Sequence, residues 1–581
     1  ILFMSGILGR LFREFAVTIT AAILISGVVS VTLTPMLCSR FLRVTTQKGR
    51  LARTLDRGFD RLLAAYRWSL SAVLKHRPAM LCVFAAVLAA TIRMYGIVPK
   101  GFIPDQDNDS LMINLRAAQG TSFYEMAPTT QHVADLVQRN PNVDSMLTST
   151  GGGQGGMNQG LIRVSLIPRR RRQQSAQQIA QQLRRELISL PNVQAFVSLP
   201  PALQIGGRVG DSTYSVTVQS PDTNDLFNYS DRLSAAMAHI DDIQDVSSDL
   251  NIKNPEVTLS IDRDKSAALG LDATQVENTL SSGYGQRWSS TIYGATTQYK
   301  VLLEVDPRDQ QYSDSLDKLT FRTPQGGMVP LQSLLTARET VGPLSINHSE
   351  QLPAVAISFG LRPGVSLGAA VDRIRHAADD ILPPTMNVAF EGSAKVFQQS
   401  TKNLNVLLLL AICVVYIVLG ALYESYIHPL TILSGLPSAG LGALITLRLF
   451  GNELNIYSFV GLIMLVGIVK KNAIMQIDFA LDAERRLGLT PAEAIYEGCL
   501  IRFRPIMMTT MAALLGTLPI ALGFGAGGEA RRPLGLAVVG GLLVSQALTL
   551  YLTPVVYSYM ATWAKVRSCA PAPIAEPAIT T

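Results

Sequence analysis

Apolar residues in this chain gather into seven long runs, separated by polar segments of very unequal length. The runs lie at residues 15–37, 78–98, 404–422, 430–449, 456–479, 505–524 and 534–560. Each is near the ~20 residues that a helix needs to cross ~30 Å of hydrocarbon. The pattern predicts a polytopic α-helical membrane protein with two separate spans, a large polar block, and then five spans.

The first apolar run repeats the last one. Arg13 and Pro35 have the same spacing as Arg532 and Pro554. The same register aligns Leu24 with Leu543, Ser26 with Ser545, and the tripeptide at 33–35 with that at 552–554. We therefore expect residues 1–39 to end an earlier repeat that is missing here, and residues 78–98 and 401–562 to supply one complete six-helix repeat. Internal repeats of this kind are common in secondary transporters.

The polar block alternates predicted strands and helices in the order β-α-β-β-α-β, which is the ferredoxin-like unit. The first copy occupies residues 99–205, with strands at 110–117, 144–149, 161–167 and 194–199 and helices at 124–138 and 176–190. A second copy spans 206–254 and 341–400, with strands at 213–219, 245–250, 354–360 and 386–390 and helices at 225–239 and 367–381. The fold class is thus seven spans with a large α+β region of two ferredoxin-like subdomains.

A smaller mixed domain at residues 255–340 interrupts the second copy. It contains predicted strands at 256–261 and 299–305 and a predicted helix at 273–280. The loop at 282–297 is long for a hairpin connection. We expect this loop to reach a neighbouring chain, with disorder as the alternative.

The net charge of +7 comes from 50 Lys and Arg against 43 Asp and Glu. Much of the positive charge lies in the linker at 40–77, and more lies at 485–504 and in the tail at 563–581. Such clusters mark the cytoplasmic side of a membrane protein, so the polar block is predicted to lie outside. Membrane orientation explains this charge without nucleic acid as a partner.

The spacing of the cysteines and histidines does not match a metal-binding motif, so a metal site is not expected. The five cysteines lie in or beside the spans, no CxxC motif occurs, and the six histidines form no HxxxH pair. The chain begins at Ile1 with an outward N-terminus and no signal peptide, which agrees with an upstream segment that is missing.

Two lysines interrupt the fifth span. Residues 456–469 are apolar but too few to cross alone, so Lys470 and Lys471 should lie within the membrane. They point about 100° apart on a helix, so one snorkels to the interface while the other faces the bundle. A charge at that depth costs roughly 2.5–3.5 kcal/mol and is normally paired. Asp478 lies about 10 Å away along the axis, so we expect aspartates on the missing repeat as partners.

The sixth span begins with Arg502 and carries Thr509 and Thr510. Together with the lysine, these groups suit a proton relay, in which a protonated carboxylate frees the lysine to change partners. The alternative is a structural anchor with positive-inside lysines, in which the threonines hydrogen-bond their own backbone. No nucleotide-binding loop occurs, which leaves an ion gradient as the energy source.

A glycine-rich loop lies between two predicted strands. Its glycines are Gly151, Gly152, Gly153, Gly155, Gly156 and Gly160. A strand rather than a helix follows, and the segment has no lysine, so it does not match a phosphate-binding loop. A flexible hairpin and a mobile gate over a binding surface remain equally open.

Several strings resemble the resistance-nodulation-division (RND) superfamily, in particular the MdtB/MdtC group of its hydrophobe/amphiphile multidrug branch. They are GRLFREFAVT, LTPMLC, LYESYIHPLTILSGLPSAGLGAL, GIVKKNAIM and RFRPIMMTT, supported by PLSINH and RRPLG. The resemblance covers essentially the whole chain and implies the last seven of twelve spans, with residues 255–340 as a docking domain. It also implies a bacterial inner-membrane antiporter, not an enzyme, driven by the proton gradient without a cofactor.

The resemblance further implies partners. These are the missing N-terminal repeat with paired aspartates, a homotrimer or heterotrimer, a periplasmic adaptor protein, an outer-membrane channel, membrane lipid and small amphiphilic substrates. It assigns the proton relay to Lys471, Arg502 and Thr509, and it places the glycine-rich loop on the family's switch loop.

The resemblance places the substrate path on Met112, Asn114, Leu147, Arg163, Val197 and Leu199. This path lacks the phenylalanines of better-known pumps, so aromatic stacking with planar drugs should be weaker. Arg163 suits anionic amphiphiles such as bile salts, with a structural salt bridge as the alternative. For the whole chain, a non-pumping structural subunit of a mixed trimer, or an inactive half-length fragment, is the alternative function.

Overall fold

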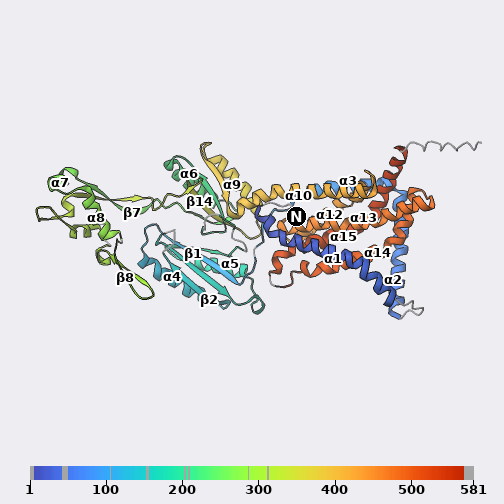
Figure 1. The fold of residues 1–581 in the computed structure, drawn as a ribbon, viewed down its shortest axis with the longest axis horizontal. Helices are drawn as coiled ribbons and strands as arrows, with labels where there is room; N and C mark the ends of the chain where they lie inside the picture. Colours follow the sequence, from blue (N-terminus) through green and yellow to red (C-terminus); the bar gives the residue numbers. More distant parts are fainter. Residues whose placement is uncertain are drawn as a thin grey trace, which may run out of the picture.

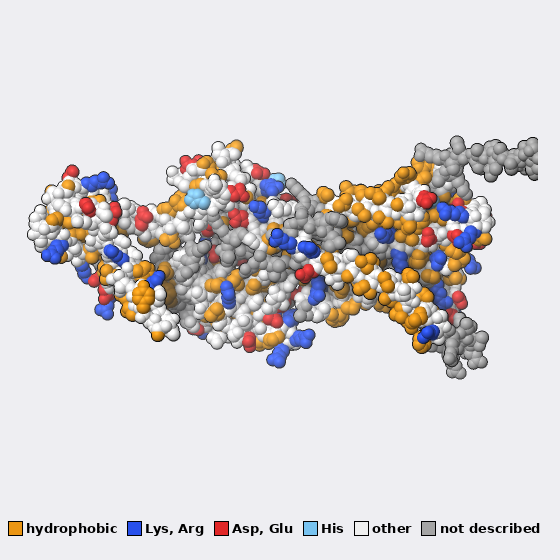
Figure 2. All heavy atoms as spheres, in the orientation of Figure 1, with side chains coloured by type: hydrophobic (Ala, Val, Ile, Leu, Met, Phe, Trp, Pro, Cys, Tyr) orange, Lys and Arg blue, Asp and Glu red, His pale blue; other side chains and the backbone are white. Residues whose placement is uncertain are grey.

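The structure, a computed structural model, is elongated, with an α+β region at one end and a bundle of long helices at the other (Figure 1). It describes residues 6–41, 50–104, 106–151, 156–201, 205–206, 210–285, 287–310, 313–525 and 527–567. Hydrophobic side chains cover much of the helical end, whereas the α+β end carries a mixed surface (Figure 2). This division matches the two kinds of sequence pattern.

Seven helical segments among the described residues are long and apolar enough to cross a membrane, which confirms the predicted fold class. They are α1 (Gly6–Phe41), α3 (Arg77–Ile97), α10 (Gly392–Tyr423), the pair α11 (His428–Leu433) and α12 (Leu436–Leu449), α13 (Ile456–Leu487), α14 (Pro491–Ala521) and α15 (Gly528–Arg567).

The fourth span is broken between α11 and α12, although the sequence predicted one run. Pro437 lies in the first turn of α12 and has no N–H to donate to the preceding turn. At the break, a Cβ on Gly435 would lie 3.1 Å from Thr549 Oγ1 of α15, so the two helices approach closely there.

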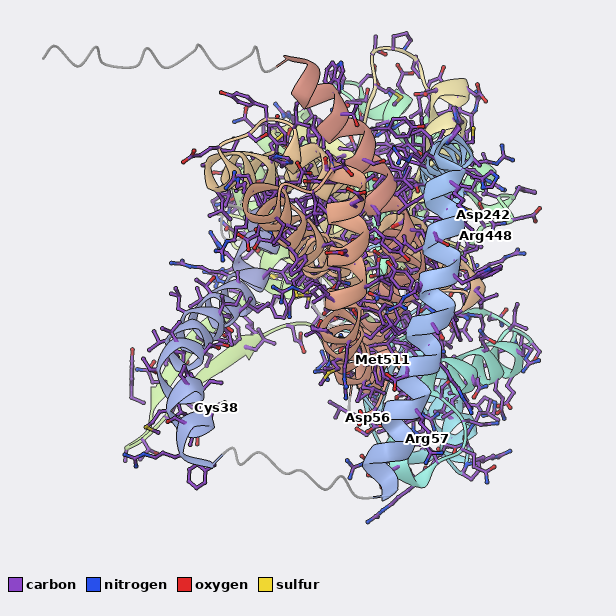
Figure 3. The ribbon with its side chains drawn as sticks, turned by 90° about the vertical axis from the view of Figure 1, so that its right-hand side faces the viewer. Cys38, Asp56, Arg57, Asp242, Arg448 and Met511 are labelled. Atoms are coloured by element: carbon purple, nitrogen blue, oxygen red, sulfur yellow. The ribbon has the colours of Figure 1, made fainter. Side chains whose placement is uncertain are left out.

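Burial differs widely among the spans, with α14 intermediate at 28%. About half of the residues in the spans formed by α11–α12, α13 and α15 are buried (50%, 56% and 56%), whereas α1, α3 and α10 are only 6% buried. Helix α15 packs along α12, α13 and α14 and forms the centre of the bundle. Seen end-on, the end of α1 marked by Cys38 stands apart from the bundle (Figure 3).

The basic linker forms an amphipathic helix, α2 (Arg50–Lys75), at the end of the bundle remote from the α+β region. Tyr66 of α2 stacks on Phe503 of α14, with the ring centroids 4.7 Å apart. The Tyr66 hydroxyl also donates to the Leu550 carbonyl of α15 at 2.8 Å. Asp56, near the start of α2 in Figure 3, forms an ion pair with Arg504 at 3.1 Å. The linker is therefore packed against the bundle.

The first α+β subdomain has one four-stranded antiparallel sheet in the order β2-β3-β1-β4. Its elements are β1 (Ser110–Ala117), α4 (Phe123–Gln138), β2 (Val143–Thr150), β3 (Gln159–Leu166), the short helix η1 (Arg169–Arg171), α5 (Ala176–Leu187) and β4 (Val193–Ser198). Alternate residues of β1, namely Leu111, Ile113 and Leu115, are buried under α4 and α5. Among the described residues of this subdomain, no helix covers the opposite face of the sheet.

The second subdomain repeats this topology in the order β6-β14-β5-β15. Its elements are β5 (Tyr214–Gln219), α6 (Thr223–Ala238), β6 (Ile243–Ser248), β13 (His348–Ser349), β14 (Leu352–Leu361), α9 (Leu367–Ile381) and β15 (Asn387–Glu391). Its core continues into the membrane bundle through Phe102, Ile456 and Val460. The Ile456 N–H donates to the Phe102 carbonyl at 3.2 Å, so the start of α13 is fixed to the α+β region.

The inserted domain lies at the far end of the molecule (Figure 1). Its elements are β7 (Asn254–Ile261), α7 (Arg263–Ala268), α8 (Ala273–Tyr284), β8 (Arg287–Tyr293), β9 (Gln298–Leu303), η2 (Pro307–Asp309), η3 (Ser313–Lys318), β10 (Thr320–Arg322), β11 (Met328–Pro330), η4 (Leu331–Ser333) and β12 (Leu335–Gly342).

The predicted long loop at 282–297 is mostly regular structure. Helix α8 continues to Tyr284, and β8 pairs with β9 in a two-stranded hairpin. Strand β8 is not visible in the sequence pattern because Ser289, Ser290 and Thr291 break its apolar alternation. The connection between the two strands is short, at residues 294–297.

Candidate functional site

The two lysines of α13 lie on different sides of the helix. Lys471 is exposed, on a strip that also carries Gly467 and Asp478, whereas Lys470 is partly buried. Among the described residues, neither lysine has an ion-pair partner. Asp478 instead accepts a hydrogen bond from the Tyr423 hydroxyl of α10 at 3.1 Å. The structure therefore leaves Lys471 on an open face of the bundle.

Arg502 and Thr509 come from α14, which packs beside α13. Arg502 is exposed, with its guanidinium 5.7 Å from the centre of the Phe479 ring of α13. Thr509 is partly buried, and its hydroxyl donates to the Ile506 carbonyl of its own helix at 3.1 Å. In the part of the chain that the structure describes, no hydrogen bond or ion pair joins Lys471, Arg502 and Thr509 to one another.

A polar cluster, of which the sequence pattern indicated only Thr510, lies beside these residues. Asn472 Nδ2 donates to Gln546 Oε1 of α15 at 2.8 Å and approaches Thr510 Oγ1 of α14 at 3.2 Å. The Thr510 hydroxyl donates to the same Gln546 oxygen at 2.9 Å. Three helices are thus joined by one hydrogen-bonded group next to Lys471. The residue in the sequence that could have indicated this cluster is Gln546, a single polar amide within the last apolar run.

Most of the predicted substrate-path residues share the open face of the first sheet. Arg163 of β3 lies between Leu147 of β2 and Met112 of β1 in register. Leu147 is 65% exposed, and Arg163 is also exposed. No described residue forms a salt bridge with Arg163, so the alternative of a structural ion pair has no support within the described chain.

Val197 of β4 lies on the other face of the sheet from Met112 and Asn114, and it also contributes to the wall of the cavity described next. This side chain is fully buried in the core, opposite Ile113, on the face that α4 and α5 cover. The β4 residues that share the open face with Met112 and Asn114 are Ser198 and Phe196, because side chains alternate along a strand. Leu199 follows the end of β4 and lines the cavity described next.

A cavity of about 340 Å³ lies where the two subdomains meet the top of the bundle. Phe196 and Leu199 from the first subdomain, Tyr214 and Asp245 from the second, and Asn452 from the bundle contribute to its wall. Apolar and charged groups therefore face the same space, which suits an amphiphilic molecule.

Two ion pairs connect the subdomains. Arg116 of β1 pairs with Asp211 at 2.9 Å, and Arg184 of α5 pairs with Asp245 of β6 at 2.8 Å. Asn114 adds a hydrogen bond from its amide to the Asp211 carbonyl at 3.0 Å. Burial raises the pKa of Asp245, and the nearby positive charge of Arg184 opposes that rise. The subdomain boundary is thus polar rather than a continuous apolar core.

Only part of the glycine-rich loop falls within the described residues. Gly151 and Gly156 have positive φ angles of 65° and 99°, which favour glycine. Gly160 belongs to β3, where a Cβ would lie 2.7 Å from Thr130 Oγ1 of α4. Gly152, Gly153 and Gly155 lie outside the described residues. Gly160 is therefore explained by helix-on-sheet packing.

The described chain combines seven spans, one of which carries Lys471, with two ferredoxin-like subdomains and an inserted domain. This arrangement is the fold of one half of an RND-type transporter. The chain belongs to the AcrB/AcrD/AcrF family, whose model matches residues 1–561.

A solved structure described as a heavy metal efflux pump has the same fold. The two chains superpose with a TM-score of 0.79 at 24% sequence identity. The match covers 87% of this chain and 53% of the other, so this chain spans about half the length of that protein.

Proposed function

We propose that this chain forms part of a proton-driven pump in a bacterial inner membrane, which exports small amphiphilic compounds, drugs among them, by substrate/proton antiport. The observation that carries the proposal is the position of Lys471. This lysine lies within a membrane-spanning helix, on an exposed strip, beside the polar cluster of Asn472, Thr510 and Gln546. An ionisable group at such a depth is functional by default.

Lys471, Arg502 and Thr509 form this chain's half of the relay. Because Lys471 lacks a carboxylate partner among the described residues, a preceding repeat would supply the aspartates that pair with it. Proton binding to such an aspartate removes its charge, so the lysine changes partners and α13 shifts relative to its neighbours. The fixed contact between Ile456 and Phe102 transmits that shift to the α+β region.

The proposed substrates are amphiphiles because apolar and charged groups share both surfaces described above. The open sheet face combines Leu147 and Met112 with Arg163. The cavity combines Phe196 and Leu199 with Asp245. The apolar body of an amphiphile would pack on the apolar side chains, and its polar head would face the charged side chain of each surface. The proposed assembly is a trimer with a periplasmic adaptor protein and an outer-membrane channel.

The test uses the complete transporter that contains this chain, reconstituted in liposomes with a pH-sensitive dye. We expect Lys471→Met to reduce substrate-dependent proton movement by at least about tenfold, a barrier change of ~1.4 kcal/mol. Lys470→Met is the matched control, because this neighbouring lysine lies off the exposed strip. We expect it to keep at least half of the wild-type flux.

Substrate binding and proton flux together distinguish a proton-moving subunit from a non-pumping subunit. The proposed surfaces lie outside the membrane spans, so Lys471→Met should leave the substrate Kd unchanged. If Lys471→Met retains normal proton flux and export, this chain is not the proton-moving subunit. The role of a non-pumping subunit in a mixed trimer then becomes the better account.

A further inference from the structure

Two rows of polar side chains face each other between α13 and α15. On α13 the row contains Asn472, Gln476 and Glu484, which are spaced by four and eight residues and so share one side of the helix. On α15 it contains Gln546, Thr553 and Tyr557, at intervals of seven and four. Both helices run away from the α+β region and pack along each other.

Hydrogen bonds join the two rows at both ends. At the end of the rows nearer the α+β region, Asn472 Nδ2 donates to Gln546 Oε1 at 2.8 Å. At the end remote from the α+β region, the Tyr557 hydroxyl donates to Glu484 Oε1 at 2.8 Å. Along the two helices, Gln476 and Thr553 lie between these two hydrogen-bonded levels. The rows therefore connect the polar cluster beside Lys471 with the end of the bundle remote from the α+β region.

The middle of the rows is buried and unpaired within the described chain. Gln476 and Thr553 are both fully buried, at 0% exposure. Gln476 Oε1, Gln476 Nε2 and Thr553 Oγ1 have no hydrogen-bond partner among the described residues. Buried polar groups almost always have a partner, either protein or ordered water. Because this chain already encloses both side chains, another subunit cannot reach them, whereas a water molecule is small enough to do so.

We propose that these rows hold a file of ordered water that carries protons between the Asn472–Thr510–Gln546 cluster and Glu484 at the cytoplasmic end. This inference rests on the proposed function, because it supplies the exit for protons that the relay receives. The amides of Asn472, Gln476 and Gln546 orient the water but do not transfer protons themselves. Water and the hydroxyls of Thr553 and Tyr557 both donate and accept.

Proton transfer along the file changes no net bonding. A proton enters at the cluster, each oxygen passes one on as it receives one, and Glu484 releases one to the aqueous side. Glu484 is partly exposed and precedes Arg485 and Arg486, and the His428 ring stacks on Tyr557 with the centroids 6.2 Å apart. The end of the file at Glu484 thus lies next to charged and titratable side chains of α13 and α11.

Gln476→Leu in the complete, reconstituted transporter is the main test. Leucine has nearly the same size but cannot hold water, so we expect substrate-dependent proton flux to fall at least fivefold. The substitution also removes two buried polar atoms that have no partner in the described protein, so no hydrogen bond within the protein is lost and the thermal midpoint should be unchanged or higher. A flux that falls while stability is maintained is a combination that a purely structural role for Gln476 does not produce.

Two further variants complete the design. Thr553→Val interrupts the file from the other helix and should also reduce flux without lowering the thermal midpoint. Ile477→Val changes the neighbouring buried residue of α13, which belongs to the apolar core, and should leave flux unchanged. A solvent deuterium isotope effect on flux should be present in the wild type and change in Gln476→Leu, because the file would then limit the rate.

The outcomes separate this inference from the proposed function. Normal flux in Gln476→Leu, combined with lost flux in Lys471→Met, overturns the water file alone. Normal flux in Lys471→Met overturns the proposed function and the file with it. Equal losses of flux and thermal midpoint in Gln476→Leu and Ile477→Val show a structural role and also overturn the file.

Discussion

At the scale of single residues, two positive charges lie where little of the chain surrounds them. Arg163 is exposed at the centre of the open sheet face, and Lys471 is exposed on the open strip of α13. By contrast, Arg172 is enclosed, with its guanidinium paired to Asp107 and, at 2.7 Å, to Asp109. The hydrogen bonds to these two aspartates outweigh the effect of burial and raise the pKa of Arg172. Arg172 is therefore structural, whereas Arg163 and Lys471 are available for other roles.

We predict that Arg163→Ala lowers export of anionic amphiphiles several-fold while leaving neutral and cationic substrates nearly unchanged. The reason is the loss of the exposed positive charge between Leu147 and Met112. The free energy of unfolding should change by less than about 0.5 kcal/mol, as for other exposed positions. Export assays with matched anionic and cationic amphiphiles check the prediction, and Arg163→Lys is the control. An unchanged substrate profile contradicts it.

At the scale of elements, α12 and α15 approach each other through glycines. A Cβ on Gly442 would lie 2.5 Å from the Gly540 carbonyl oxygen, and a Cβ on Gly540 would lie 1.9 Å from Thr446 Oγ1. Small residues at helix crossings let backbones pack closely in a membrane, where van der Waals contact drives association. These glycines therefore determine how α15 lies at the centre of the bundle.

We predict that Gly540→Ala destabilises the bundle by about 1–3 kcal/mol through overpacking. The added methyl group would collide with Thr446 and with the carbonyl of Gly442, which lies 2.9 Å away. Thermal unfolding in detergent measures the effect. Gly516→Ala in α14 is the control, because a Cβ there meets no atom within 4 Å. Equal thermal midpoints for the two variants count against close α12–α15 packing.

At the scale of the whole molecule, the inserted domain presents an apolar hairpin at the end remote from the membrane helices (Figure 1). Trp288, Ile292 and Tyr293 of β8 are 61%, 59% and 76% exposed. On β9, the Lys300 ammonium lies 4.8 Å from the centre of the Trp288 ring. Exposed apolar surface of this kind marks an interaction site. It supports the expectation that this segment reaches a neighbouring chain.

We predict that Ile292→Asp weakens the proposed trimer and shifts the complete protein toward smaller assemblies. Burying an unpaired carboxylate in an apolar contact is costly, so the association constant should fall at least about tenfold, or ~1.4 kcal/mol. Native mass spectrometry measures the distribution. Met328→Asp, at another exposed position of the same domain, is the control and should leave assembly unchanged. Normal assembly of Ile292→Asp would show that the hairpin lies outside the subunit interface.

The sequence alone predicted much of this molecule because hydrophobic periodicity carries that information. Long apolar runs gave seven spans, since a helix in lipid satisfies its own backbone. Alternation within short segments gave two copies of one sheet topology. The intramembrane lysine was also visible, because a charge in an apolar run needs no fold to be recognised.

Only the tertiary structure decided which side chains meet. Register placed the Val197 side chain in the core and the Phe196 side chain on the opposite face, where it lines the cavity, because a shift of one residue reverses the face of a strand. Packing of three helices joined Asn472, Thr510 and Gln546, and the parallel course of α13 and α15 placed Gln476 and Thr553 between two hydrogen-bonded ends. These contacts connect residues far apart in the chain, so no local pattern contains them.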